Sequence, residues 1–315
     1  MKRFNIAFVG LGSIAQRHIK NVCDYIISCG NTFSIDLYRS NLDHPIAEDI
    51  QHLVAESYLY SVEVQRDYDM VFITNPTSLH LETAVKFRPH TKAFFIEKPV
   101  FDGFDVDEDI IRTLDEIPSY VACPLHYNPV LQYIKQHIDL SKVISVRAMS
   151  SSYLPDWRPG QDYRQTYSAH ADLGGGVDID LIHEWDYLTW IFGMPIQCLG
   201  IAGKFSNLEI DSNDTALYIA KNDKMTFELH LDYFGRKTQR TLDIFTHDDT
   251  IQCDLIAGTI SYLKEGKTIN QNAERNAYQI AEIKHFFDIV EGRTENDSNV
   301  KHGMKVLKLT KTITN

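Results

Sequence analysis

The sequence predicts an α/β domain built on a parallel sheet, followed by an α+β domain with a large, mostly antiparallel, open-faced sheet. Strand and helix patterns alternate through residues 1–124, which is typical of a parallel sheet with helical crossovers. Between residues 196 and 263, strand-like stretches follow one another without helices, which favours antiparallel pairing. The 315 residues also exceed the roughly 250 to 300 at which single cores stop growing. We therefore expect domains at 1–124 and 125–315.

The first domain opens with a strand and a glycine-rich turn. Phe4–Val9 is apolar, Gly10-Leu-Gly12-Ser-Ile-Ala15 follows it directly, and helical spacing then continues to a stop at Gly30. In a dinucleotide-binding Rossmann unit, one glycine makes the tight turn and another lets the backbone approach a pyrophosphate at the helix N-terminus. An ordinary strand-to-helix turn is the alternative. The expected pyrophosphate-binding residues are Gly10, Gly12, Ser13 and Ile14.

Periodicity and turn residues predict the remaining elements. In the first domain we expect strands at 33–38, 58–64, 69–76, 92–99 and 119–123, and helices at 45–55, 77–87 and 106–117. In the second domain we expect helices at 128–138, 177–192, 276–290 and 300–313. Its strands are expected at 143–151, 196–205, 216–220, 225–233, 241–245, 251–255 and 259–263. Helices on one face leave the other face open, so we expect a homodimer or homotetramer through this C-terminal sheet.

Composition argues against several classes of protein. A net charge of -12 argues against nucleic acid or an anionic membrane as partner, because both need a basic surface. No apolar run approaches the roughly 18 residues of a membrane helix and no leader pattern precedes the first strand, so we expect a cytoplasmic protein. The five cysteines are scattered, and no His-x-x-x-His pattern occurs, so we expect neither disulfides nor a metal site.

The end of the second strand favours one cofactor over another. Dinucleotide sites for NAD usually have an acidic residue there, because a carboxylate binds both ribose hydroxyls. This chain has Arg39 and Ser40 instead. A guanidinium with a neighbouring hydroxyl suits a 2′-phosphate, so the sequence favours NADP over NAD. Stacking of Arg39 on adenine is the open alternative.

Four segments together resemble the Gfo/Idh/MocA oxidoreductase family. They are Gly10–Ala15, Thr74-Asn-Pro76-Thr-Ser-Leu-His80, Glu97-Lys98-Pro99 and Gly174-Gly-Gly-Val-Asp-Ile-Asp180-Leu-Ile-His183. The resemblance spans nearly the whole chain and implies a Rossmann domain for NAD or NADP, followed by an α+β domain for a sugar, cyclitol or related polyol. It also implies further cofactor-binding residues, namely Thr74, Asn75, Pro76, His80, Glu97 and Lys98. For His80, a plain helix-surface role is the alternative.

Lys98 and His183 are the main catalytic candidates. The resemblance implies that Lys98 lies beside the nicotinamide and the reacting carbon, where an ammonium stabilises alkoxide character. A solvated lysine after a strand is the alternative. A histidine, with a pKa near ~6.5, can take and return a hydroxyl proton, and this makes His183 an acid/base candidate. The competing interpretation is a core histidine whose ring nitrogens are hydrogen-bonded within the fold.

Asp180 is the third catalytic candidate, because it precedes His183 by three residues and would share a helical face with it. Glu184 is adjacent on that face, whereas Asp178 points elsewhere. The family usually has three residues between the aspartate and the histidine, and this chain has two. The shorter spacing leaves open whether Asp180 contacts the substrate, orients His183, or does both.

The loop at 153–173 carries candidate substrate ligands. Its aromatic faces suit a sugar, and its arginines suit a carboxylate, a phosphate or the nicotinamide carboxamide. A surface loop with a few packed aromatics is the alternative. Together with Ile182–Asp186, the loop resembles family members linked to bacterial surface-sugar biosynthesis. The expected substrate-binding residues here are Trp157, Arg158, Tyr163 and Arg164, with His126 closing the pocket from the hinge.

These residues predict an NAD(P)-dependent oxidoreductase that transfers a hydride between nicotinamide and a carbon of a sugar, sugar derivative or nucleotide sugar. The alternative is a non-catalytic NAD(P)-binding regulator or scaffold on the same fold. Retention of both Lys98 and His183 favours the enzyme. A third hypothesis is a reductase that acts on an unsaturated or non-sugar ligand, and it rests on the composition of the loop alone.

Overall fold

The computed structural model describes residues 1–272 and 274–311, which form two compact units. The first unit comprises Met1–Cys123 and Gln279–Lys305, and the second comprises Pro124–Tyr278 and the chain from Val306. The expected boundary after residue 124 lies one residue from this division. The expectation of one continuous domain at 125–315 needs correction, because residues 279–305 belong to the first unit.

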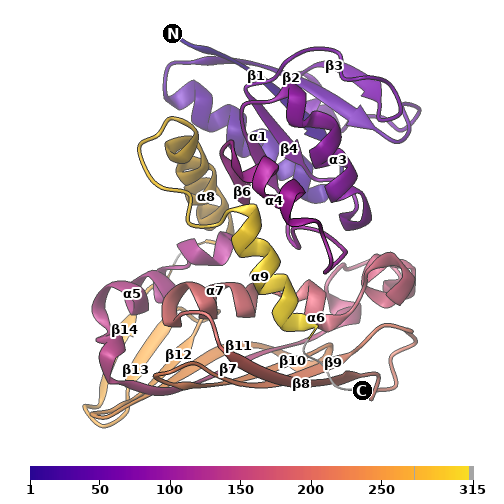
Figure 1. Ribbon diagram of the computed structural model, residues 1–315. Coiled ribbons are helices and arrows are strands. Elements are labelled where there is room, and N and C mark those ends of the chain that lie inside the picture. The colour runs from indigo at the N-terminus through magenta and orange to yellow at the C-terminus, as the bar shows by residue number, and fades with distance from the viewer. Residues whose placement is uncertain (273, 312–315) are drawn as a thin grey trace. The chain divides into compact units, whose positions relative to one another are not determined.

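The first unit contains a six-stranded parallel sheet in the order β3-β2-β1-β4-β5-β6. Its strands are β1 (Arg3–Val9), β2 (Thr32–Arg39), β3 (Val54–Leu59), β4 (Met70–Ile73), β5 (Phe94–Ile96) and β6 (Ser119–Val121). Its helices are α1 (Ser13–Ser28), α2 (Glu48–Gln51), α3 (His80–Phe87), α4 (Glu108–Asp115) and most of α8 (Arg275–Val290). All neighbouring strands run parallel in the Rossmann order, so the predicted fold of this unit is confirmed (Figure 1).

Apolar packing explains why α8 joins the first unit. Every residue of β4 and β5 is buried, as expected for central strands of a parallel sheet. Phe286 of α8 packs edge-on against Phe72 of β4 and Phe95 of β5, with ring centroids 5.6 and 5.4 Å apart. The same core cluster contains the buried face of α1. A helix near the end of the chain therefore completes a core that the first strands begin.

Some elements differ from the sequence-based expectations. Helix α2 is shorter than the expected 45–55, and β3 lies earlier than the expected 58–64. The expected helix at 77–87 begins with a 3₁₀ turn at Thr77–Leu79 before α3. Gly30 follows α1 with a φ of 70°, a left-handed conformation that glycine adopts readily, so the predicted glycine stop is confirmed.

The second unit contains an eight-stranded sheet in the order β14-β13-β12-β11-β7-β10-β9-β8. Its strands are β7 (Val143–Tyr153), β8 (Gln197–Gly203), β9 (Thr215–Lys221), β10 (Thr226–Asp232), β11 (Phe234–Thr246), β12 (Thr250–Asp254), β13 (Thr259–Tyr262) and β14 (Lys267–Asn270). Among the described strands of this sheet, only β7 and β10 pair in parallel, so the predicted mostly antiparallel sheet is confirmed. Strand β14 was not expected.

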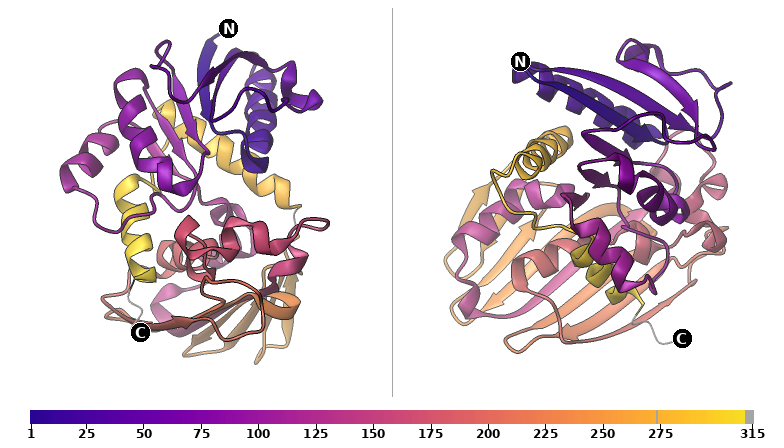
Figure 2. Two further views of the ribbon diagram at one scale, coloured as in Figure 1. Left: turned by 90° about the vertical axis from the view of Figure 1, so that its right-hand side faces the viewer. Right: turned by 45° about the horizontal axis from the view of Figure 1, so that its top comes forward.

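The helices of the second unit are α5 (Pro129–His137), α6 (Val177–Asp180) and α7 (His183–Phe192). All three lie on one face of the sheet, and no helix among the described residues covers the other (Figures 1 and 2). The first half of helix α9 (Val300–Thr310), up to Lys305, belongs to the first unit, and the rest belongs to the second. Its expected end at Ile313 lies outside the described residues.

The prediction of a single helix at 177–192 is wrong. Leu181 ends α6 with φ -99° and ψ 24°, outside helical geometry, and α7 starts afresh at His183. Asp180 and His183 therefore lie on two helices. The argument that they share one helical face does not apply to this chain.

Candidate active site

Three strand ends meet at one edge of the parallel sheet in the first unit. Strands β1, β4 and β5 are consecutive neighbours, and their carboxyl ends lead into the glycine turn, the segment at Thr74–Pro76 and the segment at Glu97–Pro99. This is the edge at which open α/β sheets bind ligands. The sheet order thus brings together the predicted cofactor-binding segments of this unit.

The glycine turn contacts the end of β4 closely. Gly10 has a φ of 93°, and a Cβ atom on it would lie 2.6 Å from the Cα of Asn75, so only glycine fits. The Thr74 hydroxyl donates to the carbonyl oxygens of Val9, at 2.9 Å, and Gly10, at 3.2 Å. These bonds join the two strand ends into one rigid surface.

That surface fits a dinucleotide. Gly12 provides no side-chain cap to α1, so the first N–H groups of the helix remain available to an anion. A Cβ atom on Gly12 would meet no atom within 4 Å, so there is open space above the turn. The buried Oδ1 of Asn75 has no hydrogen-bond partner among the described residues, although its Nδ2 donates to Thr83 at 2.8 Å. An unfilled acceptor beside the turn suits a ligand hydroxyl.

Lys98 follows β5, next to a buried carboxylate. Glu97 accepts a hydrogen bond from His18 Nε2 at 2.6 Å and another from the Lys98 backbone N–H at 3.3 Å. Burial raises the pKa of Glu97, but the His18 hydrogen bond and charge, together with the Lys98 charge, outweigh burial and leave the pKa below its usual value. Glu97 is therefore ionised at neutral pH. The sequence did not single out His18, although its place in the glycine-motif helix was a usable signal.

His80 is buried, not a helix-surface residue as the alternative had it. Its Nδ1 lies 3.1 Å from the Pro99 carbonyl oxygen and 3.2 Å from that of Val100, and its Nε2 lies 3.0 Å from the Asn75 carbonyl oxygen. Burial lowers the pKa of His80, with the carbonyl contacts acting in the opposite direction. His80 thus joins the segment after β4 to the segment after β5.

Arg39 ends β2 and lines a hollow of about 330 Å³. The other polar residues around the hollow are His44, Gln51 and Ser57. The Arg39 guanidinium donates to the His44 carbonyl oxygen. Asp36, an acidic residue within β2, is instead held by Arg66 at 2.7 Å and by the Tyr68 hydroxyl at 2.9 Å.

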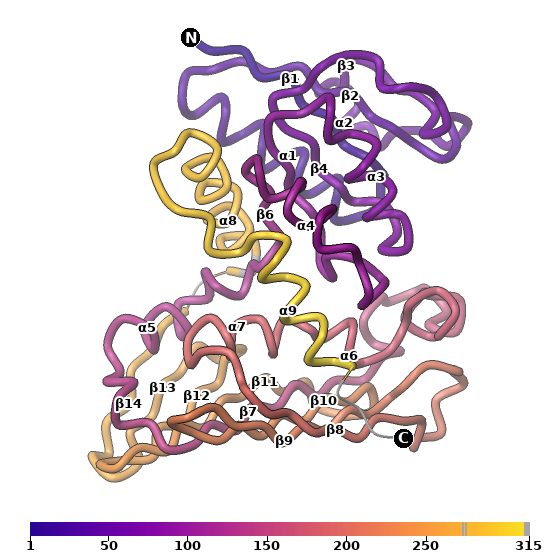
Figure 3. The backbone as a smooth tube through the Cα atoms, in the orientation of Figure 1, coloured from indigo at the N-terminus to yellow at the C-terminus, as the bar shows by residue number. Residues whose placement is uncertain are grey.

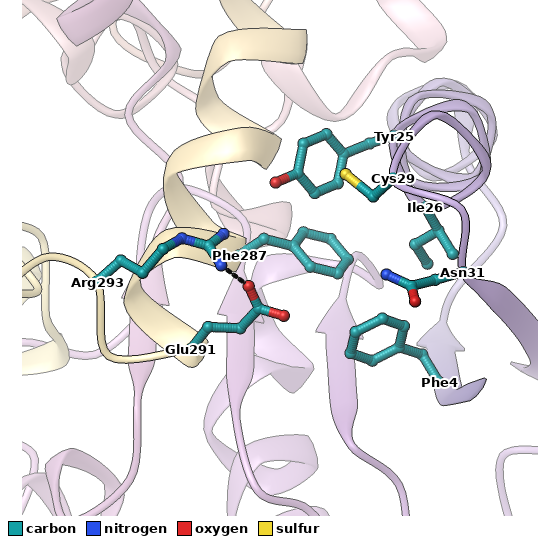
Figure 4. A pocket seen from close by; sticks show the side chains of 8 residues that line it. All are labelled: Phe4, Tyr25, Ile26, Cys29, Asn31, Phe287, Glu291 and Arg293. Carbon is teal, nitrogen blue, oxygen red and sulfur yellow. Dashed lines mark hydrogen bonds and ion pairs between the residues drawn. The ribbon is translucent and has the colours of Figure 1, made fainter. Parts of the chain in front are cut away.

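A second hollow, of about 180 Å³, lies where β1 begins and where α1 and α8 end (Figure 4). Aromatic rings of Phe4, Tyr25 and Phe287 line it, with the Arg293–Glu291 ion pair among its walls. It contains none of the predicted site residues. The strand ends described above therefore remain the candidate cofactor site.

In the second unit, Asp180 is buried and its two carboxylate oxygens accept hydrogen bonds from two tyrosines. The Tyr167 hydroxyl donates to Oδ1 and the Tyr233 hydroxyl to Oδ2, both at 2.6 Å. Burial raises the pKa of each tyrosine, and the Asp180 charge raises it further. Both tyrosines thus remain protonated donors. Tyr233, from a distant part of the chain, was missed because no local pattern links it to Asp180.

The neighbours of His183 on α7 have structural partners. Glu184 is fully buried and pairs with Arg240 of β11 at 2.9 Å, so its role is to anchor α7 on the sheet. His126 is also buried; its Nε2 lies 3.0 Å from Asp186, and its ring stacks on Trp190 at 4.2 Å. His183 itself is half-buried at the start of α7.

The loop between β7 and α6 winds through short 3₁₀ turns (Figure 3). Two predicted residues lie beside the tyrosines of Asp180: Trp157 packs edge-on against Tyr233 at 5.2 Å, and the Arg158 guanidinium lies 5.7 Å from the Tyr167 ring. The other two lie elsewhere. Arg164 pairs with Asp162 and Glu209 at an exposed site, and the Tyr163 hydroxyl accepts a hydrogen bond from the Glu209 N–H.

His170, Asp172 and Asp211 form a cluster of possible metal ligands that the sequence did not suggest. His170 Nε2 lies 2.7 Å from the Arg164 carbonyl oxygen, and both aspartates are exposed.

No helix within residues 1–272 and 274–311 has the length and apolarity needed to cross a bilayer.

Comparison with known proteins agrees with this geometry. Residues 4–118 match the model of the Gfo/Idh/MocA oxidoreductase family, described as its NAD-binding Rossmann fold. Inositol 2-dehydrogenase of Rhizobium meliloti (strain 1021) is 24% identical over 140 residues, which cover 42% of this chain and 39% of that protein. The chain thus matches well under half the length of this curated relative.

Two solved structures share the fold across nearly the whole chain. UDP-N-acetylglucosamine 3-dehydrogenase GnnA from Acidithiobacillus ferrooxidans has a TM-score of 0.78 at 17% identity, covering 99% of this chain and 97% of that one. The WlbA dehydrogenase from Bordetella pertussis, in complex with NADH and UDP-GlcNAcA, has a TM-score of 0.78 at 17% identity, covering 99% and 95%. Residues 4–118 thus resemble the NAD-binding domain of the Gfo/Idh/MocA oxidoreductases, and the chain shares the two-sheet fold of these two structures.

Proposed function

We propose that the protein is an NAD(P)-dependent dehydrogenase that transfers a hydride between nicotinamide and a carbon of a sugar, sugar derivative or nucleotide sugar. The observation that carries this proposal is the strand order, which joins the glycine turn, Asn75 and Lys98 at consecutive strand ends. An ammonium on the same sheet edge as the pyrophosphate site suits oxyanion stabilisation during hydride transfer.

The proposed roles follow from side-chain chemistry. When bound, the nicotinamide supplies or accepts the hydride. Lys98 stabilises the developing alkoxide, and His183 takes the hydroxyl proton in oxidation or returns it in reduction. Asp180, with its oxygens fixed by Tyr167 and Tyr233, holds a negative charge in a defined place and favours the protonated form of a neighbouring base.

A nucleotide sugar is the proposed substrate class. The names of GnnA and WlbA describe dehydrogenases of UDP-linked N-acetyl sugars or their complexes, and both share the fold of the whole chain. Trp157 and Arg158, beside the tyrosines of Asp180, offer an aromatic face and a cation of the kind that sugar and phosphate groups bind.

The test is a coupled assay with purified protein. NADH and NADPH oxidation, and the reverse reaction, are followed with UDP-GlcNAc, UDP-GlcNAcA, free N-acetylglucosamine and myo-inositol. We expect turnover with a UDP-sugar that exceeds turnover with the free sugar. Tight binding of a reduced nicotinamide without hydride exchange on any sugar would instead support the regulator or scaffold.

NADP is the proposed preferred cofactor. Arg39 occupies the end of β2, where an acidic residue would bind the ribose hydroxyls of NAD. The hollow beside it is lined by Arg39, His44 and Gln51, which can contact a 2′-phosphate, and Asp36 is committed to Arg66 and Tyr68. We expect Arg39→Ala to weaken NADPH binding by about tenfold, or about 1.4 kcal/mol, and NADH binding far less. Fluorescence titration checks this, and a wild-type preference for NADH would overturn it.

A homodimer or homotetramer through the open face of the second sheet is also proposed. Leu199 and Ile201 of β8 lie opposite Ile219 and Leu217 of β9, and all four side chains are at least 40% exposed. Such an apolar patch is typical of an association surface. Light scattering should give an oligomer for the wild type and a smaller species for the Leu199→Asp/Ile219→Asp double variant. A monomeric wild type would exclude the proposal.

The proposed location is the cytoplasm, where the five free thiols stay reduced.

A further inference from the structure

Two buried histidines contact the segment that carries Lys98. His18 of α1 bonds the Glu97 carboxylate on one side, and His80 of α3 contacts the Pro99 and Val100 carbonyl oxygens on the other. Each histidine is 1% exposed. Lys98 therefore lies between two residues that are held by side chains from different helices.

The His18–Glu97 bond is the stronger of these contacts. Its 2.6 Å length is typical of a charge-assisted hydrogen bond, and such bonds are about twice as strong as neutral ones. The other oxygen of Glu97 accepts from the Lys98 backbone N–H at 3.3 Å. One carboxylate thus links a helix side chain directly to the backbone of the proposed catalytic residue.

The helix that supplies His18 is the helix of the glycine motif. Its N-terminus follows Gly12, where the pyrophosphate is expected, and His18 lies on its second turn. His18 is also fixed laterally, since its ring packs edge-on against Phe95 of β5 at 4.9 Å. Its Nδ1 is buried and has no hydrogen-bond partner among the described residues, so the Glu97 contact is its main polar constraint.

We infer that His18 is a positioning residue for hydride transfer, which, through Glu97, fixes Lys98 relative to the helix that binds the cofactor pyrophosphate. The inference rests on the proposed function, because His18 acts through Lys98. A displacement of a reacting group by about 1 Å can cost about 100-fold in rate, so loss of this link should lower turnover strongly while the cofactor still binds.

The kinetic test compares His18→Phe, His18→Gln and Glu97→Gln. Phenylalanine fills the space and removes the donor, whereas glutamine can still donate to Glu97. We expect kcat to fall about 100-fold in His18→Phe, with the cofactor Kd within about threefold, and to recover at least in part in His18→Gln. A primary deuterium isotope effect on kcat, measured with nicotinamide deuterated at C4, should increase in His18→Phe because hydride transfer becomes slower. A merely structural role would not raise it.

The matched control is His285→Phe, which removes the donor of a histidine–carboxylate pair with Asp297 at 3.1 Å in the same unit. We expect it to leave kcat and the isotope effect unchanged. An active wild type with a near-normal His18→Phe variant would refute the inference and leave the proposed function intact.

A second measurement needs no substrate. Hydrogen exchange of the peptide covering residues 94–101 should be at least about tenfold faster in His18→Phe than in the wild type, and near wild-type in His18→Gln, because the Glu97 link no longer holds the turn. Unchanged exchange would overturn the inference, even if no sugar proved to be a substrate. An inactive wild type with the expected exchange would count against the proposed function alone.

Discussion

The Glu97–Pro99 turn of the first unit and the Asp180 carboxylate of the second are held in different ways. The turn is fixed by histidine rings that contact a carboxylate and backbone carbonyls, all at the ends of neighbouring strands. Asp180 is fixed by two tyrosine hydroxyls, one from the loop before α6 and one from Tyr233, between β10 and β11. The turn therefore depends on the Rossmann scaffold, whereas the placement of Asp180 depends on two removable hydroxyl groups.

The largest expected effect comes from the turn itself. Lys98→Ala should lower kcat about 1000-fold, because it removes the proposed oxyanion stabiliser, while the scaffold and the cofactor Kd stay nearly unchanged. Steady-state kinetics and fluorescence titration measure the two quantities. Lys92→Ala, which removes an exposed lysine shortly before the same strand, is the control. A near-normal kcat would exclude Lys98 from catalysis.

The next effect concerns the start of α7. His183→Asn should lower kcat/KM about 100-fold and flatten its pH profile, because asparagine cannot take or return a proton near neutral pH. His137→Asn replaces an exposed histidine of the same unit and should leave the profile as it is in the wild type. A profile that keeps its shape in His183→Asn would remove this histidine from the mechanism.

Removal of a single hydroxyl tests the second region directly. Tyr233→Phe should lower kcat/KM about tenfold and destabilise the fold by about 1 kcal/mol, since one oxygen of the buried Asp180 loses its donor. Tyr218→Phe is the matched control, because the buried Tyr218 hydroxyl has no hydrogen-bond partner among the described residues. Equal effects of the two substitutions would mean that the Asp180 contact carries no function.

The smallest expected effect is on acid stability. The pKa of Glu97 in the folded protein is below its usual value, so its contribution to stability is present above the unfolded pKa and is lost as the pH falls through the folded pKa. The difference in free energy of unfolding between the wild type and Glu97→Gln should therefore shrink on acidification. Urea unfolding at neutral and acidic pH measures it, and a constant difference would argue against an ionised Glu97.

Much of the first unit could be predicted because its signals are local. The glycine turn after the first strand, the buried apolar strands and the glycine helix stop are each patterns of a few residues, and Gly10 and Gly30 adopt the backbone conformations that glycine permits. The sheet edge that carries Thr74 and Lys98 follows from strand–helix alternation.

The sequence by itself determined the two sheet types, the family segments and the chemical kinds of candidate residue, because periodicity and turn residues act along the chain. Only the tertiary structure decided that α8 completes the first core, that Asp180 and His183 lie on separate helices, and that Tyr233 and His18 hold the two carboxylates. The contacts made by α8, Tyr233 and His18 join residues far apart in the chain. They depend on which buried polar groups packing brings within hydrogen-bond distance, and no local pattern records that.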